Sequence, residues 1–318
     1  LLSSYTTSLK AGWNMIGGVS QVTDFTSPQD NPDNSIIPGT LYSWNPTSFS
    51  YQPETEILPN QGYWVLTLRD CQLTVRSEIG IQTAPQAVPA LEVMIQLNLS
   101  AGDWHQNLQI GLDQSAAAGL EPMDRALPPI GPQAQDYQAH LISGQYRLRR
   151  DVRPMSDQTV SWQMRLSSPE PVQLTVDSQE IPDGQELVIS DGQMETVLSA
   201  GMEMQLASGE RELTVSLRPL PEVTQLLQNY PNPFNPETWI PFELNQDSDV
   251  SLTIYDTAGC QIRHLDLGFQ PAGAYLRRDR AIYWDGRTQS GEQVASGTYF
   301  YTLKTEGYTS TQKMIILK

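Results

Sequence analysis

The strongest constraint in this sequence is the alternation of apolar and polar residues along short stretches. Such a pattern places one row of side chains on a buried face of a sheet and the next row on its wet face. Helical periodicity is nearly absent, and the best helical candidate, residues 114–119, is about one turn long. The alternating stretches lie at residues 91–99, 160–166, 172–176, 212–217, 250–255 and 297–303. With turn signals such as Asp191-Gly192 between them, they predict an all-β protein.

Domain boundaries are expected because the length of 318 residues exceeds the roughly 100–150 residues of one typical domain. Pro-rich stretches at residues 83–90 and 219–222 adjoin strand-like stretches and mark two such boundaries. We therefore predict three small antiparallel β domains in series, of which the last two are Ig-like sandwiches. Their predicted bounds are residues 1–82, 83–220 and 221–318.

Charge limits the partners of the chain. Its 36 acidic and 19 basic side chains give a net charge of −17, which repels nucleic acid and anionic membrane surfaces. No apolar run approaches the ~20 residues that a membrane span needs. We expect neither a nucleic-acid partner nor a membrane span. The sequence starts without Met or a signal peptide, so we expect a mature product or a fragment of a longer precursor.

Residue types that carry chemistry are few and scattered. His105, His140 and His264 stand far apart, without zinc-ligand spacing or a nucleophile–base pattern, and each is expected to be a surface or strand residue. No loop matches a phosphate-binding or dinucleotide motif. We therefore expect no enzymatic activity. Cys71 and Cys260 fall in different predicted domains, and two separate buried thiols are favoured over a disulfide between them.

Calcium is the one ion that the sequence allows as a cofactor. Calcium takes several oxygen ligands, and two loops offer carboxylates, although neither has EF-hand spacing. The weak candidates are Asp30 and Asp33 in the first loop, which also holds Asp24 and Asn34, and Asp113 and Asp124 beside the second. An acidic, solvated loop is the favoured alternative in both cases.

One basic cluster stands out in this acidic chain, and it consists of Arg147, Arg149, Arg150 and Arg153. On a strand, Arg147 and Arg149 share a face. We expect these side chains to pair with neighbouring carboxylates. An interface that attracts an acidic patch on another copy is the alternative.

The last segment has the most specific pattern. It opens with Asn229-Tyr230-Pro231-Asn232-Pro233-Phe234-Asn235-Pro236, continues through Trp284-Asp285-Gly286, and ends Lys313-Met314-Ile315-Ile316. Three prolines in six residues exclude a helix there. The segment resembles the C-terminal sorting domains of type IX secretion substrates and the related Ig-like domain of flagellar hook-capping proteins. This resemblance implies a sandwich of about seven strands with a role in sorting, surface attachment or capping. A spacer without a sorting role is the alternative.

The first segment is rich in aromatic residues. Its Gly-Trp-Asn stretch at Trp13 and its Gly-Tyr-Trp-Val stretch at Tyr63 and Trp64 resemble a small β domain of bacterial surface proteins. We expect these residues and Trp44 to form much of its core, because large aromatic side chains suit a small core. An exposed aromatic platform for carbohydrate is the alternative.

Taken together, the sequence predicts a non-catalytic, secreted structural protein of the bacterial cell surface or extracellular matrix. Its expected partners are other copies of itself, other surface proteins and the export machinery. One form of this role is a self-assembling fibre, in which the N-terminal stretch with Leu2, Tyr5 and Thr7 is the donor strand. Two alternatives stay open: the non-catalytic tail of a larger secreted hydrolase, and a carbohydrate-binding adhesin module.

Overall fold

The structure is a computed structural model that describes residues 2–48, 50–77, 91–131, 136–176, 181–198 and 201–318. Within these ranges the chain forms strands, turns and bends, and no helix, so the predicted all-β class is confirmed. Consequently no helix of the described ranges is long and apolar enough to cross a membrane. The helical candidate at residues 114–119 forms a turn and bends instead. The predicted boundary stretch at residues 83–90 lies outside the described residues.

The chain divides into two compact units. Unit 1 consists of Leu1–Pro182, Leu187–Gly192 and Val197–Leu217, and unit 2 of Asp183–Glu186, Gln193–Thr196 and Arg218–Lys318. The finer division into three domains stays a prediction.

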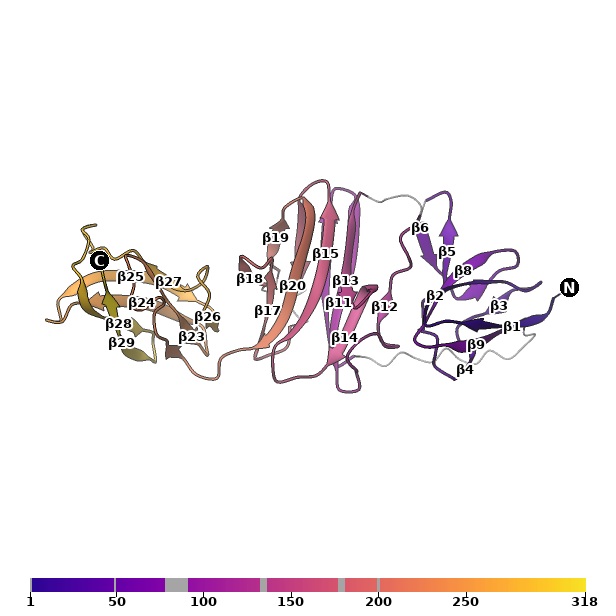
Figure 1. The fold of residues 1–318 in the computed structure, drawn as a ribbon, viewed down its shortest axis with the longest axis horizontal. Coiled ribbons are helices and arrows are strands. Elements are labelled where there is room, and N and C mark those ends of the chain that lie inside the picture. The colour runs from indigo at the N-terminus through magenta and orange to yellow at the C-terminus, as the bar shows by residue number, and fades with distance from the viewer. Residues whose placement is uncertain (1, 49, 78–90, 132–135, 177–180, 199–200) are drawn as a thin grey trace. The chain divides into compact units, whose positions relative to one another are not determined.

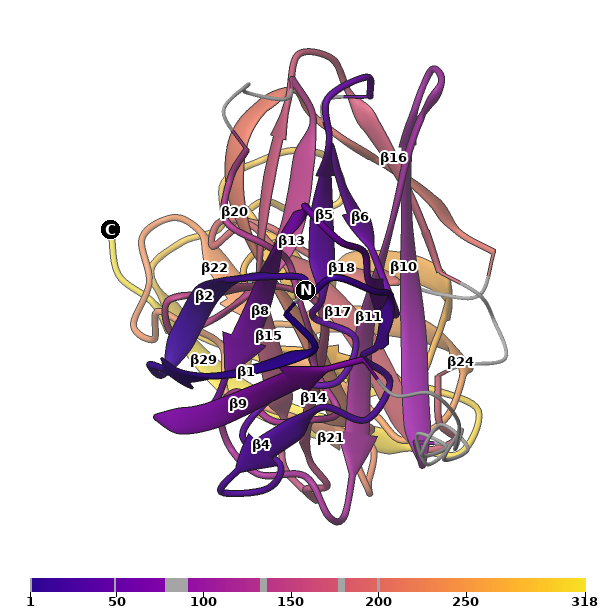
Figure 2. The ribbon, with the colours of Figure 1, turned by 90° about the vertical axis from the view of Figure 1, so that its right-hand side faces the viewer.

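The N-terminal part of unit 1 consists of three small antiparallel sheets (Figure 2). The first has the order β1-β9-β4, the second β2-β8-β5-β6, and the third pairs β3 with β7. The strands are β1 (Ser4–Leu9), β2 (Gly12–Gly17), β3 (Thr23–Asp24), β4 (Gln29–Asn31), β5 (Tyr42–Asn45), β6 (Ser50–Pro53), β7 (Glu56–Ile57), β8 (Gly62–Thr67) and β9 (Cys71–Arg76). Alternate residues of β8 and β9, such as Tyr63, Val65, Leu73 and Val75, are buried in one shared core.

The N-terminal stretch is already paired within the chain. β1 pairs with β9 along its whole length, from Ser4 opposite Arg76 to Leu9 opposite Cys71. Before the strand, the carbonyl of Leu2 accepts the backbone N–H of Ser20 at 2.9 Å. Inside it, Tyr5 donates to the carbonyl of Gly17 at 2.6 Å and Thr7 lies opposite Leu73. The prediction that this stretch is a donor strand for another copy is therefore wrong for the chain as it is folded here. Its partner is β9, the last strand of the same N-terminal segment.

The rest of unit 1 is built on an eleven-stranded sheet (Figure 1). Its strands are β10 (Val93–Ala101), β11 (Trp104–Asp113), β12 (Arg125–Ala126), β13 (Gln138–Ser143), β14 (Tyr146–Pro154), β15 (Val160–Ser168), β16 (Val172–Val176), β17 (Gln185–Ser190), β18 (Glu195–Leu198), β19 (Glu203–Leu206) and β20 (Gly209–Pro219). The order is β18-β17-β20-β15-β13-β14-β11-β10-β16-β19, with β12 added beside β14. Most pairs are antiparallel, but β11 and β14 run parallel.

One face of this sheet encloses a single apolar core. In β15 the predicted alternation is observed, since Trp162, Met164 and Leu166 are all fully buried. The indole N–H of Trp162 donates to the carbonyl of Asp151 at 3.1 Å, so the largest buried side chain keeps its polar atom satisfied. The intervening residues, such as Arg165, face away from the core. The side chains that alternate with these core residues therefore lie on the outer face of the sheet.

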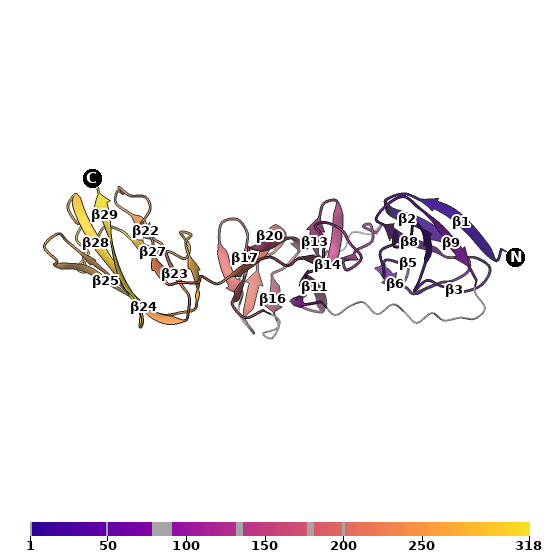
Figure 3. The same cartoon turned by 90° about the horizontal axis from the view of Figure 1, so that it is seen from below.

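Residues 218–318 of unit 2 form three sheets around another core (Figure 3). Their orders are β21-β23-β26, β22-β27 and β25-β24-β28-β29. The strands are β21 (Gln225–Leu226), β22 (Thr238–Ile240), β23 (Phe242–Leu244), β24 (Ser248–Tyr255), β25 (Gln261–Gln270), β26 (Gly273–Tyr275), β27 (Ile282–Trp284), β28 (Gly297–Lys304) and β29 (Thr309–Ile316). The rings of Phe242 and Tyr275 stack at 4.4 Å inside this core.

Candidate functional site

Asn229, which opens the proline-rich motif of unit 2, is only 2% exposed. Its backbone N–H donates to the hydroxyl of Tyr301 at 2.9 Å, and that hydroxyl donates to the carbonyl of Leu227. The side-chain amide of Asn229 donates to the carbonyl of Pro231 and the hydroxyl of Thr238, at 3.1 and 2.9 Å. Burial raises the pKa of Tyr301 to about 12, so the phenol keeps its proton. Asn229 therefore fixes the chain's path into the prolines.

Phe234 anchors the middle of the motif against the end of the chain. Its side chain is 2% exposed, with its ring 5.6 Å from that of Trp284. The backbone N–H of Phe234 donates to the carbonyl of Ile315, and its carbonyl accepts the N–H of Leu317, both at 3.0 Å. The side chain of Asn232 accepts the N–H of Ile315 at 3.0 Å. The motif thus lies along β29 as an extra extended segment.

The Trp284-Asp285-Gly286 turn packs directly beneath the motif. Trp284 is 1% exposed, and its indole N–H donates to the carbonyl of Arg287 at 2.9 Å. Gly286 has φ +69°, and a Cβ atom there would lie 2.6 Å from the carbonyl oxygen of Pro236. Only glycine fits so close to the backbone in this conformation. The structure therefore brings the two separated halves of the sequence motif together.

An aromatic surface borders the motif, consisting of the exposed Tyr283 and Arg278 and the half-buried Tyr230 and Trp239. The ring of Trp239 lies 6.4 Å from that of Tyr230 and 5.6 Å from that of Tyr283. The guanidinium of Arg278 lies 4.2 Å from the centre of the Trp239 ring, a cation–π contact. Tyr283 is 48% exposed. Aromatic and Arg side chains are the types enriched in protein interfaces.

Of this surface, only Tyr230 was a predicted site residue. Trp239, Arg278 and Tyr283 belong to no motif, and they meet because β22 pairs with β27, placing Trp239 opposite Tyr283. The available signal was the alternation of β27, in which Tyr283 stands between two inward residues. Pro231, Asn232, Pro233, Asn235 and Pro236 are exposed on the same segment as Tyr230.

The aromatic residues of the N-terminal part do not all enter its core. Tyr63 is 1% exposed and lies in that core, whereas Trp13, Trp44 and Trp64 are half-buried. Successive residues of a strand face opposite sides of the sheet, so Trp64 points away from the side of Tyr63. Its indole donates to the hydroxyl of Tyr51 at 3.1 Å. The prediction of a four-aromatic core is therefore wrong for the tryptophans, and a carbohydrate surface stays an alternative.

In the first predicted calcium loop, protein donors engage the buried carboxylate. Asp30 is 8% exposed, and its Oδ2 accepts the backbone N–H groups of Ser35 and Ile36 at 2.5 and 2.9 Å. Asp33 is exposed, and its backbone carbonyl accepts a hydrogen bond from Arg69 at 3.0 Å. Asp30 thus holds the turn of the loop in shape.

The second pair of calcium candidates is held in a similar way. Asp113 accepts hydrogen bonds from Ser115, which lower the pKa of its carboxyl. Asp124 is fully buried and accepts the N–H groups of Glu121 and Val152, while burial raises its pKa to about 7. Within the described ranges, no group of three or more His, Cys, Asp or Glu side chains is placed to hold a metal. Calcium binding stays a prediction.

Both cysteines are free thiols. Cys71 is buried as predicted, and burial raises the pKa of its thiol. Cys260 is exposed, so the prediction of a buried thiol is wrong there, because it follows a turn at the start of a solvent-facing strand. His105 and His264 are exposed on β11 and β25, and His140 is buried on β13.

The arginine cluster on β14 has mixed partners. Arg153 forms the predicted ion pair, with Asp151 at 3.0 Å. Arg149 and Arg150 donate instead to backbone carbonyls, at 3.2 and 2.8 Å. Arg147 lines a cavity.

The geometry of residues 218–318 defines an Ig-like β domain, and comparison with known families agrees. Residues 234–309 match the family described as FlgD Ig-like domain, which confirms the predicted resemblance in this range. A search of curated proteins found no match. The resemblance of the N-terminal segment stays a prediction.

Structural comparison found six matching chains of solved structures, and two of them are described here. One is PorZ of Porphyromonas gingivalis, described as an essential bacterial surface component of its type IX secretion system; it shares 12% identity with 50% of this chain, at a TM-score of 0.26. The other is dimeric latent PorU of the same organism, with 11% identity over 99% of this chain and a TM-score of 0.23. The matches cover 21% and 30% of those proteins, so this chain spans less than a third of either. Likenesses at these TM-scores show neither a shared fold nor a shared function.

Proposed function

We propose that the chain is a non-catalytic, secreted structural protein of the bacterial cell surface, and that residues 221–318 act in its sorting or attachment. One observation carries the proposal: the motif residues divide into two sets. Asn229, Phe234, Trp284 and Gly286 are buried and complete the domain, while the exposed part of the motif borders the aromatic surface. The match of residues 234–309 to an Ig-like family supports a non-catalytic module.

The buried set makes the domain depend on its own C-terminal strand. β29 pairs with β28 on one side, and Phe234 bonds to Ile315 and Leu317 beyond it. A partner would therefore meet the aromatic surface only in the completed fold. We infer that the export machinery or another surface protein binds this surface, and that Trp239 and Arg278 form its centre.

The test follows surface delivery of the full chain, with an added epitope tag, in a bacterium that has a type IX secretion system. The fraction of tag accessible to external protease is compared for wild type, Trp239→Ala and Phe269→Ala. Phe269 is a matched control, since it is an exposed aromatic residue, at 64%, on another strand. The proposal predicts that Trp239→Ala abolishes delivery and Phe269→Ala does not. Equal delivery of both folded variants would refute the proposed role of the aromatic surface in delivery.

Self-assembly into a fibre is a separate prediction. β1 and β4 end their three-stranded sheet and are the candidate edges for pairing between copies. Light scattering at increasing concentration measures the particle mass directly. Growth of that mass supports fibre assembly, and a constant 35.5 kDa rejects it in favour of a monomeric spacer or tail.

A further inference from the structure

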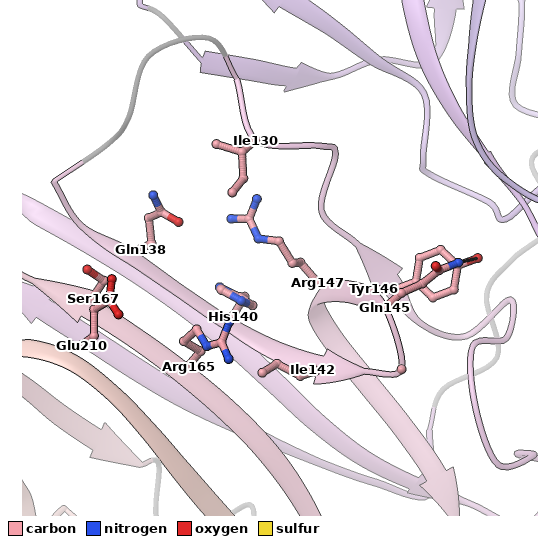
Figure 4. A pocket seen from close by; sticks show the side chains of 11 residues that line it. Ile130, Gln138, His140, Ile142, Gln145, Tyr146, Arg147, Arg165, Ser167 and Glu210 are labelled. Carbon is pink, nitrogen blue, oxygen red and sulfur yellow. Dashed lines mark hydrogen bonds between the residues drawn. The ribbon is translucent and has the colours of Figure 1, made fainter.

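A cavity of about 520 Å³ lies on the outer row of the eleven-stranded sheet in unit 1. Its polar lining includes His140, Gln145, Arg147, Arg165, Ser167 and Glu210. Figure 4 shows His140 and the guanidinium groups of Arg147 and Arg165 in this cavity, from the neighbouring strands β13, β14 and β15. A volume of this size suits a small ligand, because such sites span about 300–1,000 Å³.

The strand register assembles the cavity. β13 lies between β14 and β15, with His140 opposite Arg165 and Ile142 opposite Arg147. The alternate residue Leu141 is fully buried in the core on the other face. His140, Arg147 and Arg165 therefore share the outer face, although they are far apart in sequence.

Two polar groups in this cavity lack partners. His140 is 6% exposed, and its Nδ1 has no hydrogen-bond partner among the described residues. The Nε of Arg147 is buried and equally unpartnered within the described part of the chain. Buried polar atoms in native proteins are nearly always hydrogen-bonded, so each exception needs an explanation, and a ligand bound in the adjoining cavity is one such explanation. No acidic side chain in the described ranges forms an ion pair with Arg147, whereas Arg165 pairs with Glu212.

The electrostatics favour one negative charge. Burial, with added repulsion from Arg147 and Arg165, lowers the pKa of His140 to about 4, so the imidazole is neutral at pH 7. The exposed carboxylate of Glu210 stands at the rim. Among the residues that the structure describes, Arg147 is thus the one cation of the cavity without a counter-charge. A single guanidinium matches a carboxylate, which it binds through two parallel hydrogen bonds.

We propose that this cavity binds an acidic sugar unit of the uronic acid type. Arg147 binds its carboxylate, and the imidazole of His140 forms a hydrogen bond to one oxygen of the same carboxylate. The amide of Gln145 and the hydroxyl of Ser167 bond to ring hydroxyls, and Ile142 supplies an apolar contact. This proposal does not rest on the proposed function, because the cavity shares no residue with the aromatic surface in unit 2.

The test is a calorimetric titration of the full chain at pH 7 with D-glucuronate as the probe. D-glucose has the same ring without the charge, and inorganic phosphate has charge without the ring. Arg147→Gln removes the central cation, and Arg149→Gln is its matched control, because Arg149 is exposed on the same strand and does not line the cavity. Circular dichroism confirms that both variants fold.

The proposal predicts glucuronate binding that weakens at least about tenfold in Arg147→Gln and is unchanged in Arg149→Gln, as loss of a charge-assisted pair implies. Glucose should bind at least about tenfold more weakly than glucuronate. Absence of glucuronate binding at millimolar concentration would overturn the proposal, as would equal binding by the two variants. Phosphate binding as strong as that of glucuronate would reject the sugar and leave a general anion site.

Discussion

Two buried polar sites, Asn229 in unit 2 and the pair His140 and Arg147 in unit 1, differ in how their nitrogen atoms are satisfied. In unit 2, the amide of Asn229 donates to Pro231 and Thr238, and its backbone N–H reaches Tyr301. In unit 1, buried nitrogens of His140 and Arg147 have no partner in the described chain. A satisfied buried polar group adds to stability, whereas an unsatisfied one costs free energy until a ligand completes it. The difference separates a motif that completes its own domain from the cavity for which we propose a ligand.

The largest expected effect concerns the apolar anchor of the motif. Phe234→Ala removes a buried ring packed against Trp284 and should lower the free energy of unfolding of unit 2 by about 3–5 kcal/mol. Native-state hydrogen exchange of the amides of β28 and β29 measures that free energy without requiring both units to unfold together. A loss below about 1 kcal/mol would show that the motif is not part of this core.

The next largest effect tests the hydrogen bonds of the buried Asn229 side chain. Asn229→Leu removes the donor to the Thr238 hydroxyl and one of the two donors to the Pro231 carbonyl, and should cost about 2–3 kcal/mol, measured at the same amides. Asn235→Leu is the matched control, because Asn235 is exposed in the same motif, and it should stay within about 0.5 kcal/mol of wild type. If the two variants were alike, the partners of Asn229 would not be needed for folding.

The pH dependence of unit 1 examines His140. Its folded pKa of about 4 lies below the ordinary value of 6.5, so between these values the unfolded state binds more protons than the folded state. Stability contributed by the neutral imidazole is therefore full above pH 6.5 and is lost as pH falls toward 4. The charges that oppose protonation are Arg147 and Arg165, and Glu210 at the rim favours it.

Lowering the pH from 7 to 5 should therefore cost wild type about 2 kcal/mol relative to His140→Leu. The comparison cancels the titration of all other groups that are distant from the substitution, including Asp124. It is measured by hydrogen exchange of core amides in β13 and β15. Parallel pH profiles of the two proteins would mean that His140 is protonated as easily in the fold as outside it.

The smallest expected change in stability concerns Arg147, the unpaired cation of the cavity. Arg147→Met replaces an unpaired cation by an apolar chain of similar length, so the stability of unit 1 should be unchanged or higher by up to about 1 kcal/mol. The same hydrogen-exchange measurement of core amides in β13 and β15 decides it. A loss of more than about 2 kcal/mol would reveal a partner for Arg147 within the protein.

Local pattern predicted much of the fold, because it depends on neighbours in sequence. The alternation at residues 160–166 places Trp162 and Met164 in the core, and the C-terminal motif predicts its Ig-like domain. Long-range pairing was not predictable: β1 takes β9 as its partner, and β11 runs parallel to β14. For the same reason no sequence motif predicted the cavity, because the pairing of separate strands brings His140 and Arg147 together.

The most direct test is a crystal structure of the full chain grown with D-glucuronate, at a resolution that shows ordered water. The account predicts that the side-chain amide of Asn229 donates to Pro231 and Thr238 and accepts from Gln228. It also predicts that Arg147 and His140 both contact the glucuronate carboxylate. An ion pair between Arg147 and Glu210, with a protein partner on Nδ1 of His140, would contradict the account.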